Sequence, residues 1–139
     1  MDLGLAGKRI IVFGGSAGIG RATVDALVAD GARVVVVGRG EERAERTARE
    51  IAERFDTEVT AIVGDLTEPG AADSIVAGAA ERLSGLDGIA VTTGLGMRGQ
   101  RDLLGADDDD WLATFDDVLM GTVRACRAVV PVLVEGGGG

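Results

Sequence analysis

The stretch that decides the fold is residues 10–22, IIVFGGSAGIGRA. An apolar run leads into a turn that carries Gly14, Gly18 and Gly20, and residues with helical spacing follow the turn at once. A strand, a glycine-rich turn and a helix in this order can form a cradle for a phosphate group. Because 23 of the 139 residues are glycine, three glycines at this spacing also arise by chance, and only their context can decide.

Length and composition fit one globular domain spanning residues 1–139, with 46% hydrophobic and 27% charged residues. The longest uncharged apolar run, residues 128–134, is too short to span a membrane, so we expect no membrane partner and a cytoplasmic location. The net charge of −9, with Lys8 as the single lysine, predicts no nucleic-acid partner. Histidine is absent and Cys126 is the one cysteine, so we expect no disulfide, no His/Cys metal site and a buried Cys126.

Apolar periodicity predicts that strands and helices alternate four times along the chain. Apolar runs bounded by turns predict strands at residues 9–13, 33–37, 58–63 and 88–93. Helical spacing predicts helices at residues 19–30, 41–55, 70–83 and from near 107 past 128, with Pro131 expected to bend or shorten the last one. Parallel strands need helix-sized connections. We therefore expect an α/β fold, a Rossmann-type doubly wound parallel sheet, with these four strands as part of a larger sheet.

The glycines of the opening stretch would each have a physical role at the end of the first strand. Gly14 permits the tight turn, Gly18 lets the backbone approach a pyrophosphate, and Gly20 allows the helix to pack closely on the strand. Ser16 can add a hydroxyl donor, and the helix N-terminus offers free N–H groups to an anion. The alternative is a strand-to-helix turn that needs flexible residues and binds nothing. In that first helix we expect the inward face to carry Ile19, Ala22, Ala26 and Leu27.

Arg39 follows the second predicted strand, 19 residues after Gly20, where a residue that contacts the ribose is expected. An acidic residue there would favour NAD, because it accepts a hydrogen bond from the ribose 2′-hydroxyl. Gly38 leaves room, and the Arg39 guanidinium suits a 2′-phosphate, so the sequence favours NADP over NAD. The alternative is that Arg39 is an ordinary solvated arginine.

These motifs resemble those of the short-chain dehydrogenases/reductases. The turn from Gly14 to Gly20 is similar to that family's cofactor motif, Gly38-Arg39 resembles its NADP-preferring members, and Asp65-Leu66 resembles its adenine-contacting pair. The resemblance implies that the cofactor is held by Gly14, Ser16, Ala17, Gly18, Ile19, Gly20, Arg39, Asp65, Leu66, Thr93 and Gly94. It also implies that Asp65 accepts from the adenine amino group and that Leu66 offers its backbone N–H. Without the family, Asp65 is a loop acid that could cap a helix.

Three departures from the family pattern stand out. Phe13 occupies a position where the family usually has threonine, and Thr92-Thr93-Gly94 replaces its usual Asn-Asn-Ala. In the last helix, Val118 stands where the family has the asparagine that bends the helix and anchors a water of the proton relay. A valine side chain cannot form that hydrogen bond.

The family's catalytic groups, a serine and a Tyr-x-x-x-Lys motif, have no counterpart in residues 1–139, which contain no tyrosine and only Lys8, ahead of the first strand. The resemblance therefore implies the cofactor-binding half of an oxidoreductase, truncated before the catalytic segment, and we assign no catalytic residue. The complete form would move a hydride between NADP and a small carbonyl or alcohol. One alternative is a truncated or degenerate module that binds nucleotide or a partner without turnover. Another is an α/β domain that binds no nucleotide.

The last predicted helix has apolar residues on more than one face. Phe115, Leu119 and Val123 lie on one side, and Val118, Met120 and Val129 are turned elsewhere. In the family this helix pairs with its copy in another subunit, so we expect a homo-oligomer through it, or a missing remainder of the fold. Trp111 would be a core or interface anchor. The four acids at residues 107–110 are expected to cap the helix rather than to bind a metal.

Overall fold

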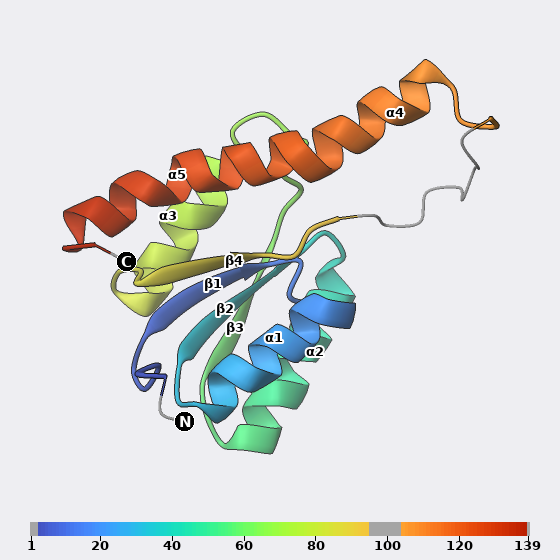
Figure 1. Ribbon diagram of the computed structural model, residues 1–139. Helices are drawn as coiled ribbons and strands as arrows, with labels where there is room; N and C mark the ends of the chain where they lie inside the picture. The colour runs from blue at the N-terminus through green and yellow to red at the C-terminus, as the bar shows by residue number, and fades with distance from the viewer. Residues whose placement is uncertain (1–2, 95–103, 139) are drawn as a thin grey trace.

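A computed structural model describes residues 3–94 and 104–138. Four strands form one parallel sheet in the order β3-β2-β1-β4 (Figure 1). The strands are β1 (Arg9–Phe13), β2 (Arg33–Gly38), β3 (Val59–Val63) and β4 (Gly88–Val91). Helices α1 (Gly18–Ala29) and α2 (Glu41–Phe55) cover one face, and α3 (Ala71–Leu83) and α5 (Gly121–Glu135) cover the other. The predicted doubly wound α/β sheet is confirmed.

Strands β1 and β2 lie at the centre of the sheet and are apolar along nearly their whole length, because helices cover both of their faces. One layer of the core lies under α3 and α5 and contains Ile11, Phe13, Val35 and Val37. The other lies under α1 and α2 and contains Ile10, Val12, Val34 and Val36. Alternate residues of one strand thus belong to opposite layers, as the two-residue period of a strand requires.

Helix α1 buries a different face from the one that the sequence predicted. Gly20, Val24 and Val28 are buried, whereas Ile19 is 82% exposed. These buried residues recur every four positions and so lie along one side of the helix. Leu27 is partly buried against the core as predicted. The prediction was wrong for Ile19, Ala22 and Ala26, which are exposed, because a stripe containing glycine was not recognised as an inward face. The small residue lets the helix approach the sheet, and the two valines fill the space beyond it.

The last helical segment is three consecutive elements rather than one regular helix. It consists of α4 (Asp108–Phe115), a π-helical turn η1 (Asp116–Met120) and α5, which contains Pro131 and continues to Glu135. Proline therefore does not shorten the helix, since Val129, Val132 and Leu133 around it pack against the core. The exposed Cys126 corrects the expectation of a buried cysteine. It follows the buried Ala125 by one residue, which turns its side chain about 100° away from the core.

The acidic run before α4 forms a capping box. Asp107 Oδ1 accepts a hydrogen bond from the Asp110 backbone N–H at 2.9 Å, and Asp110 Oδ2 accepts one from the Asp107 N–H at 3.2 Å. The predicted capping role is confirmed. Among the described residues, no three His, Cys, Asp or Glu side chains form a group that could hold a metal ion. None of the helices in residues 3–94 and 104–138 is long and apolar enough to cross a bilayer.

Candidate cofactor-binding site

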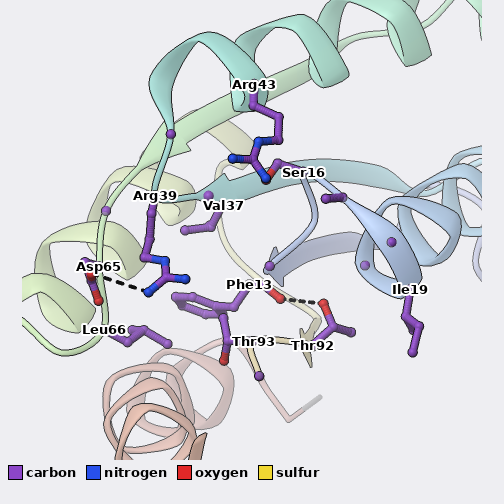
Figure 2. A pocket seen from close by; sticks show the side chains of 18 of the residues that line it. Phe13, Ser16, Ile19, Val37, Arg39, Arg43, Asp65, Leu66, Thr92 and Thr93 are labelled. Atoms are coloured by element: carbon purple, nitrogen blue, oxygen red, sulfur yellow. Dashed lines mark hydrogen bonds and ion pairs between the residues drawn. The ribbon is translucent and has the colours of Figure 1, made fainter. Parts of the chain in front are cut away.

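A pocket of about 560 Å³ opens at the carboxyl ends of the strands (Figure 2). It lies where the chain order reverses, because β1 has β2 on one side and β4 on the other. Open α/β sheets bind ligands at such a position. All eleven residues predicted for the cofactor line this pocket, together with Phe13, Val37, Gly38, Gly40, Arg43, Gly64, Thr92 and Asp117.

The three glycines of the first turn have distinct surroundings. A Cβ atom on Gly14 would lie 2.9 Å from the Thr92 Oγ1, and φ there is +78°. A Cβ on Gly20 would lie 2.1 Å from the Gly14 carbonyl oxygen and 2.4 Å from the Thr92 Oγ1, so this approach leaves no room for a side chain. Gly18 has φ of +52°, and a Cβ there would meet nothing within 4 Å among the described residues. Gly14 and Gly20 therefore bring backbones together, whereas Gly18 keeps the floor of the pocket open.

The N-terminus of α1 opens into the pocket without a side-chain cap. Its N-cap residue, Ala17, forms no capping hydrogen bond, and the first turn holds no acidic residue, within the described chain. Only from Arg21 onward do backbone N–H groups have helical partners, beginning with the Ala17 carbonyl at 3.1 Å. The preceding N–H groups and the helix dipole make this end of α1 attractive to an anion.

Ser16 fixes the glycine turn against the second βα unit. Its carbonyl accepts a hydrogen bond at 3.1 Å from the Thr47 hydroxyl, and the Thr47 side chain is buried in α2. A Cβ on Gly38 would lie 2.7 Å from the Ser16 Oγ, so a larger residue at the end of β2 would have to displace the Ser16 side chain. The turn after β1 and the end of β2 thus form one continuous wall of the pocket.

Arg39 extends from the end of β2 toward two carboxylates. Its Nη1 lies 4.0 Å from Asp65 Oδ2 and 3.9 Å from Asp117 Oδ2, and 42% of its side chain is exposed (Figure 2 shows the Asp65 pair). Asp65 also accepts hydrogen bonds through Oδ1 from the Thr67 backbone N–H and hydroxyl, at 2.9 and 2.8 Å. Asp65 therefore closes a short turn and is not a helix cap, since α3 begins at Ala71 with Gly70 before it.

The end of β4 supplies two threonines to the pocket. The strand ends at Val91, two residues earlier than predicted, although the Thr92 N–H and Oγ1 both still bond to the Phe13 carbonyl, at 2.9 and 2.8 Å. Thr93 also lines the pocket, and its hydroxyl oxygen is buried and has no hydrogen-bond partner in the described structure. A buried unpaired hydroxyl is costly, and a polar ligand group could satisfy it.

Two charged residues of the pocket were missed by sequence reasoning. Arg43 lies in the first turn of α2 and lines the pocket with Arg39, four residues before it. The spacing of four residues between Arg39 and Arg43, at the start of a predicted helix, could have indicated that both arginines face the same site. Asp117 belongs to the π-helical turn, and its place in the pocket depends on how the last helix crosses the sheet.

The π-helical turn is tied to the loop after β3. Arg124 Nη2 donates to Asp116 Oδ1 at 2.6 Å, and Arg124 Nη1 donates to the Leu66 carbonyl at 3.1 Å. The hydrogen bond to Asp116 raises the pKa of the Arg124 guanidinium. The Val118 carbonyl accepts a hydrogen bond from the Thr122 hydroxyl at 2.8 Å. The wide turn is therefore present without the asparagine that the family resemblance associates with it.

The strand order and the pocket at the strand ends define a Rossmann-like α/β fold. The model of the short chain dehydrogenase family matches residues 8–139, and the chain belongs to this family. A reductase of a hexahydroindene-carboxyl-CoA from Mycobacterium tuberculosis is 32% identical over 127 residues, covering 91% of this chain and 48% of the relative. The uncharacterized oxidoreductase YvrD of Bacillus subtilis is 28% identical over 135 residues, covering 96% and 49%.

Solved structures agree with this membership. L-sorbose reductase from Gluconobacter frateurii, complexed with NADPH and L-sorbose, superposes with a TM-score of 0.85 at 28% identity. The match covers 100% of this chain and 52% of that one. The chain thus spans about half the length of the relatives it matches.

Proposed function

We propose that the chain is the cofactor-binding half of an NADP-dependent short-chain oxidoreductase, which as a whole moves a hydride between the nicotinamide and a small carbonyl or alcohol. The observation that carries the proposal is one pocket that combines the uncapped N-terminus of α1 with Arg39 and Arg43. A helix N-terminus suits a pyrophosphate, and guanidinium groups suit a 2′-phosphate. The family membership and the NADPH complex of L-sorbose reductase support the same cofactor class.

The pocket residues fit the parts of this cofactor. Gly18 and its neighbours Ser16, Ala17 and Ile19 would hold the pyrophosphate, and Arg39 the 2′-phosphate. Asp65 and Leu66 border the region proposed for the adenine, and the unpaired hydroxyl of Thr93, beside Gly94, would receive a polar group of the ribose. When bound, the cofactor would supply or accept the hydride, whereas these residues bind and orient it.

Nucleotide binding tests the proposal directly. We expect saturable NADPH binding, measured by calorimetry, that weakens at least about tenfold in Arg39→Asp, because charge-assisted hydrogen bonds to a phosphate are replaced by repulsion. Gly18→Val should weaken both NADPH and NADH, since its side chain would fill the open floor. Arg49→Asp, an equal charge reversal at an exposed position of α2 outside the pocket, is the matched control. Absence of saturable binding, or equal loss in the control, would refute the proposal.

A second candidate is a nucleotide-binding module without turnover. Val118 favours it, because this side chain cannot hold the water that the family resemblance assigns to the proton relay. The two candidates differ in one assay, the oxidation of NADPH by the purified protein with a panel of ketones and aldehydes. Turnover contradicts the non-catalytic candidate, whereas tight NADPH binding with no turnover supports it only when the protein tested is isolated at its natural length from its source.

We also propose that copies of the chain associate through the last helix. Trp111, Leu112, Phe115 and Leu119 are 55%, 65%, 54% and 48% exposed, and they line an apolar hollow with Thr114 and Val118. Trp111 is therefore not a core residue of the chain itself, and such a patch is unusual on a monomer. Sedimentation should show a dimer or larger species that dissociates in Phe115→Asp but not in Val134→Asp, a control on the same helix outside the hollow. A wild-type monomer would refute this association.

A cytoplasmic location is part of the same proposal, since we expect an enzyme that uses NADP to obtain this cofactor from the cytoplasm. The single cysteine is consistent with a protein that needs no disulfide. Cell fractionation with an antibody against the chain would test the location, and recovery in a secreted fraction would refute it.

A further inference from the structure

Three charged side chains from separate parts of the chain meet at one end of the pocket. Arg39 follows β2, Asp65 follows β3, and Asp117 lies in the π-helical turn η1. The Arg39 guanidinium is within 4.0 Å of both carboxylates. One positive charge therefore faces two negative charges where the 2′ position of the ribose is expected, and the sum over the three groups is negative.

The contacts of Arg39 leave the guanidinium available to a ligand. Both N···O distances are at the long end of ion pairing, and 42% of the Arg39 side chain is exposed to solvent. Exposed ion pairs of this kind contribute little. A phosphate monoester, which carries close to two negative charges, can therefore compete for Arg39. The two carboxylates nevertheless stay near, and their charge acts on whatever Arg39 binds.

Asp117 differs from Asp65 in how it is held. Asp65 binds Thr67 through one oxygen, which fixes it as part of the loop after β3. Asp117 is carried by a turn that the Asp116 to Arg124 ion pair anchors to that loop, at 2.6 Å. The neighbouring residues of η1 thus serve two purposes, since Asp116 secures the turn and Asp117 points its charge at Arg39.

We propose that Asp117 is a specificity-determining residue that weakens the preference for a 2′-phosphorylated cofactor. Its carboxylate repels a 2′-phosphate at Arg39, whereas the 2′-hydroxyl of NADH carries no charge to be repelled. The protein would then prefer NADPH over NADH less strongly than a pocket that had the same two arginines but lacked the Asp117 carboxylate. This inference rests on the proposed function, because it needs a nucleotide in the pocket.

The test compares affinities for NADPH and NADH in the wild type, Asp117→Asn and the control Glu53→Gln. Asparagine keeps the size of the side chain and removes its charge. For a charge about 7 Å from the phosphate in a well-hydrated site, we expect NADPH to bind about fivefold tighter in Asp117→Asn at low salt, with NADH nearly unchanged. The gain should shrink as salt is added. Glu53→Gln removes an equal charge from an exposed position of α2 outside the pocket, so the ratio of the two affinities should stay within about twofold.

The outcomes separate this inference from the proposed function. If NADPH binds saturably and needs Arg39, but Asp117→Asn leaves the affinity ratio unchanged or lowers it, the inference is overturned and the proposed function stands. An equal rise in Glu53→Gln also overturns it, since the effect would then belong to net charge. If neither nucleotide binds the wild type, the proposed function fails, and the inference with it. Thermal unfolding of each variant establishes that the proteins compared are folded.

Discussion

Replacing Gly20 by alanine should destabilise the fold although Gly20 lies in a helix, where alanine is usually preferred. The helical preference alone would stabilise the variant by about 1 kcal/mol. Against this, the new Cβ would lie 2.1 Å from the Gly14 carbonyl oxygen and 2.7 Å from the Gly14 carbonyl carbon. These atoms are backbone, so α1 and the turn after β1 must separate by more than an ångström to restore ordinary contact.

Such a separation loosens the packing of α1 on the sheet, where Val24 and Val28 are 0% and 5% exposed. Overpacking of a tight site costs about 1–3 kcal/mol, occasionally more, and a backbone overlap of this size belongs at the upper end. Net of the helical preference, we expect Gly20→Ala to lose about 2 kcal/mol of unfolding free energy. This corresponds to a melting temperature lower by roughly 5–10 °C for a domain of this size.

Gly18→Ala provides the matched control, because it places the same methyl group two residues away in the same turn. No described atom lies within 4 Å of that position, and the cost there comes only from φ of +52°, about 1 kcal/mol. Urea unfolding followed by circular dichroism measures both variants. The reasoning is refuted if Gly20→Ala lies within about 0.5 kcal/mol of the wild type, or if Gly18→Ala is the more destabilised of the two.

Three further predictions follow from single contacts. Hydrogen bonds from Arg9, at 2.7 and 2.8 Å from its guanidinium, lower the pKa of Asp87, so this pair stabilises the fold above the ordinary aspartate range. The difference in melting temperature between the wild type and Asp87→Asn should therefore be largest at neutral pH, begin to shrink as the pH falls below about 4, and disappear only once the pH passes the lowered pKa of Asp87 in the folded state; a constant difference would contradict it. Thr93→Val removes an unpaired buried hydroxyl and should leave stability equal or raise it by about 1 kcal/mol, while NADPH binds several-fold more weakly; a marked loss of stability would contradict the first part. Arg124→Met removes the hydrogen bonds to Asp116 and to the Leu66 carbonyl. In this variant, amide hydrogen exchange should become faster in the π-helical turn than in the wild type, with little change in α3; unchanged exchange in the turn would contradict the prediction.

The sequence predicted those parts of the site that depend on local patterns. The glycine turn, Arg39 at the end of β2 and Asp65 after β3 each follow a strand whose own apolar run marks where it ends. The carboxyl ends of parallel strands lie at the same edge of the sheet. The prediction of parallel strands was therefore enough to predict that these residues lie close together. The prediction of the inward face of α1 failed for a local reason as well. Glycine has no side chain, so a hydrophobic pattern does not identify Gly20 as part of the buried face.

The remaining parts depend on tertiary contacts that no local pattern records. Residues 116–120 contain no glycine or proline that would mark a break in a helix, yet they form a π-helical turn held by Arg124, which also reaches the Leu66 carbonyl 58 residues away in sequence. That turn decides which of two adjacent aspartates faces Arg39. A helix of regular period through this segment would rotate Asp117 relative to the pocket, by roughly 100° for each residue of altered register. The charge beside Arg39 is therefore set by the packing of the last helix, and a sequence comparison restricted to the end of β2 would show Arg39 without the Asp117 carboxylate that lies beside it.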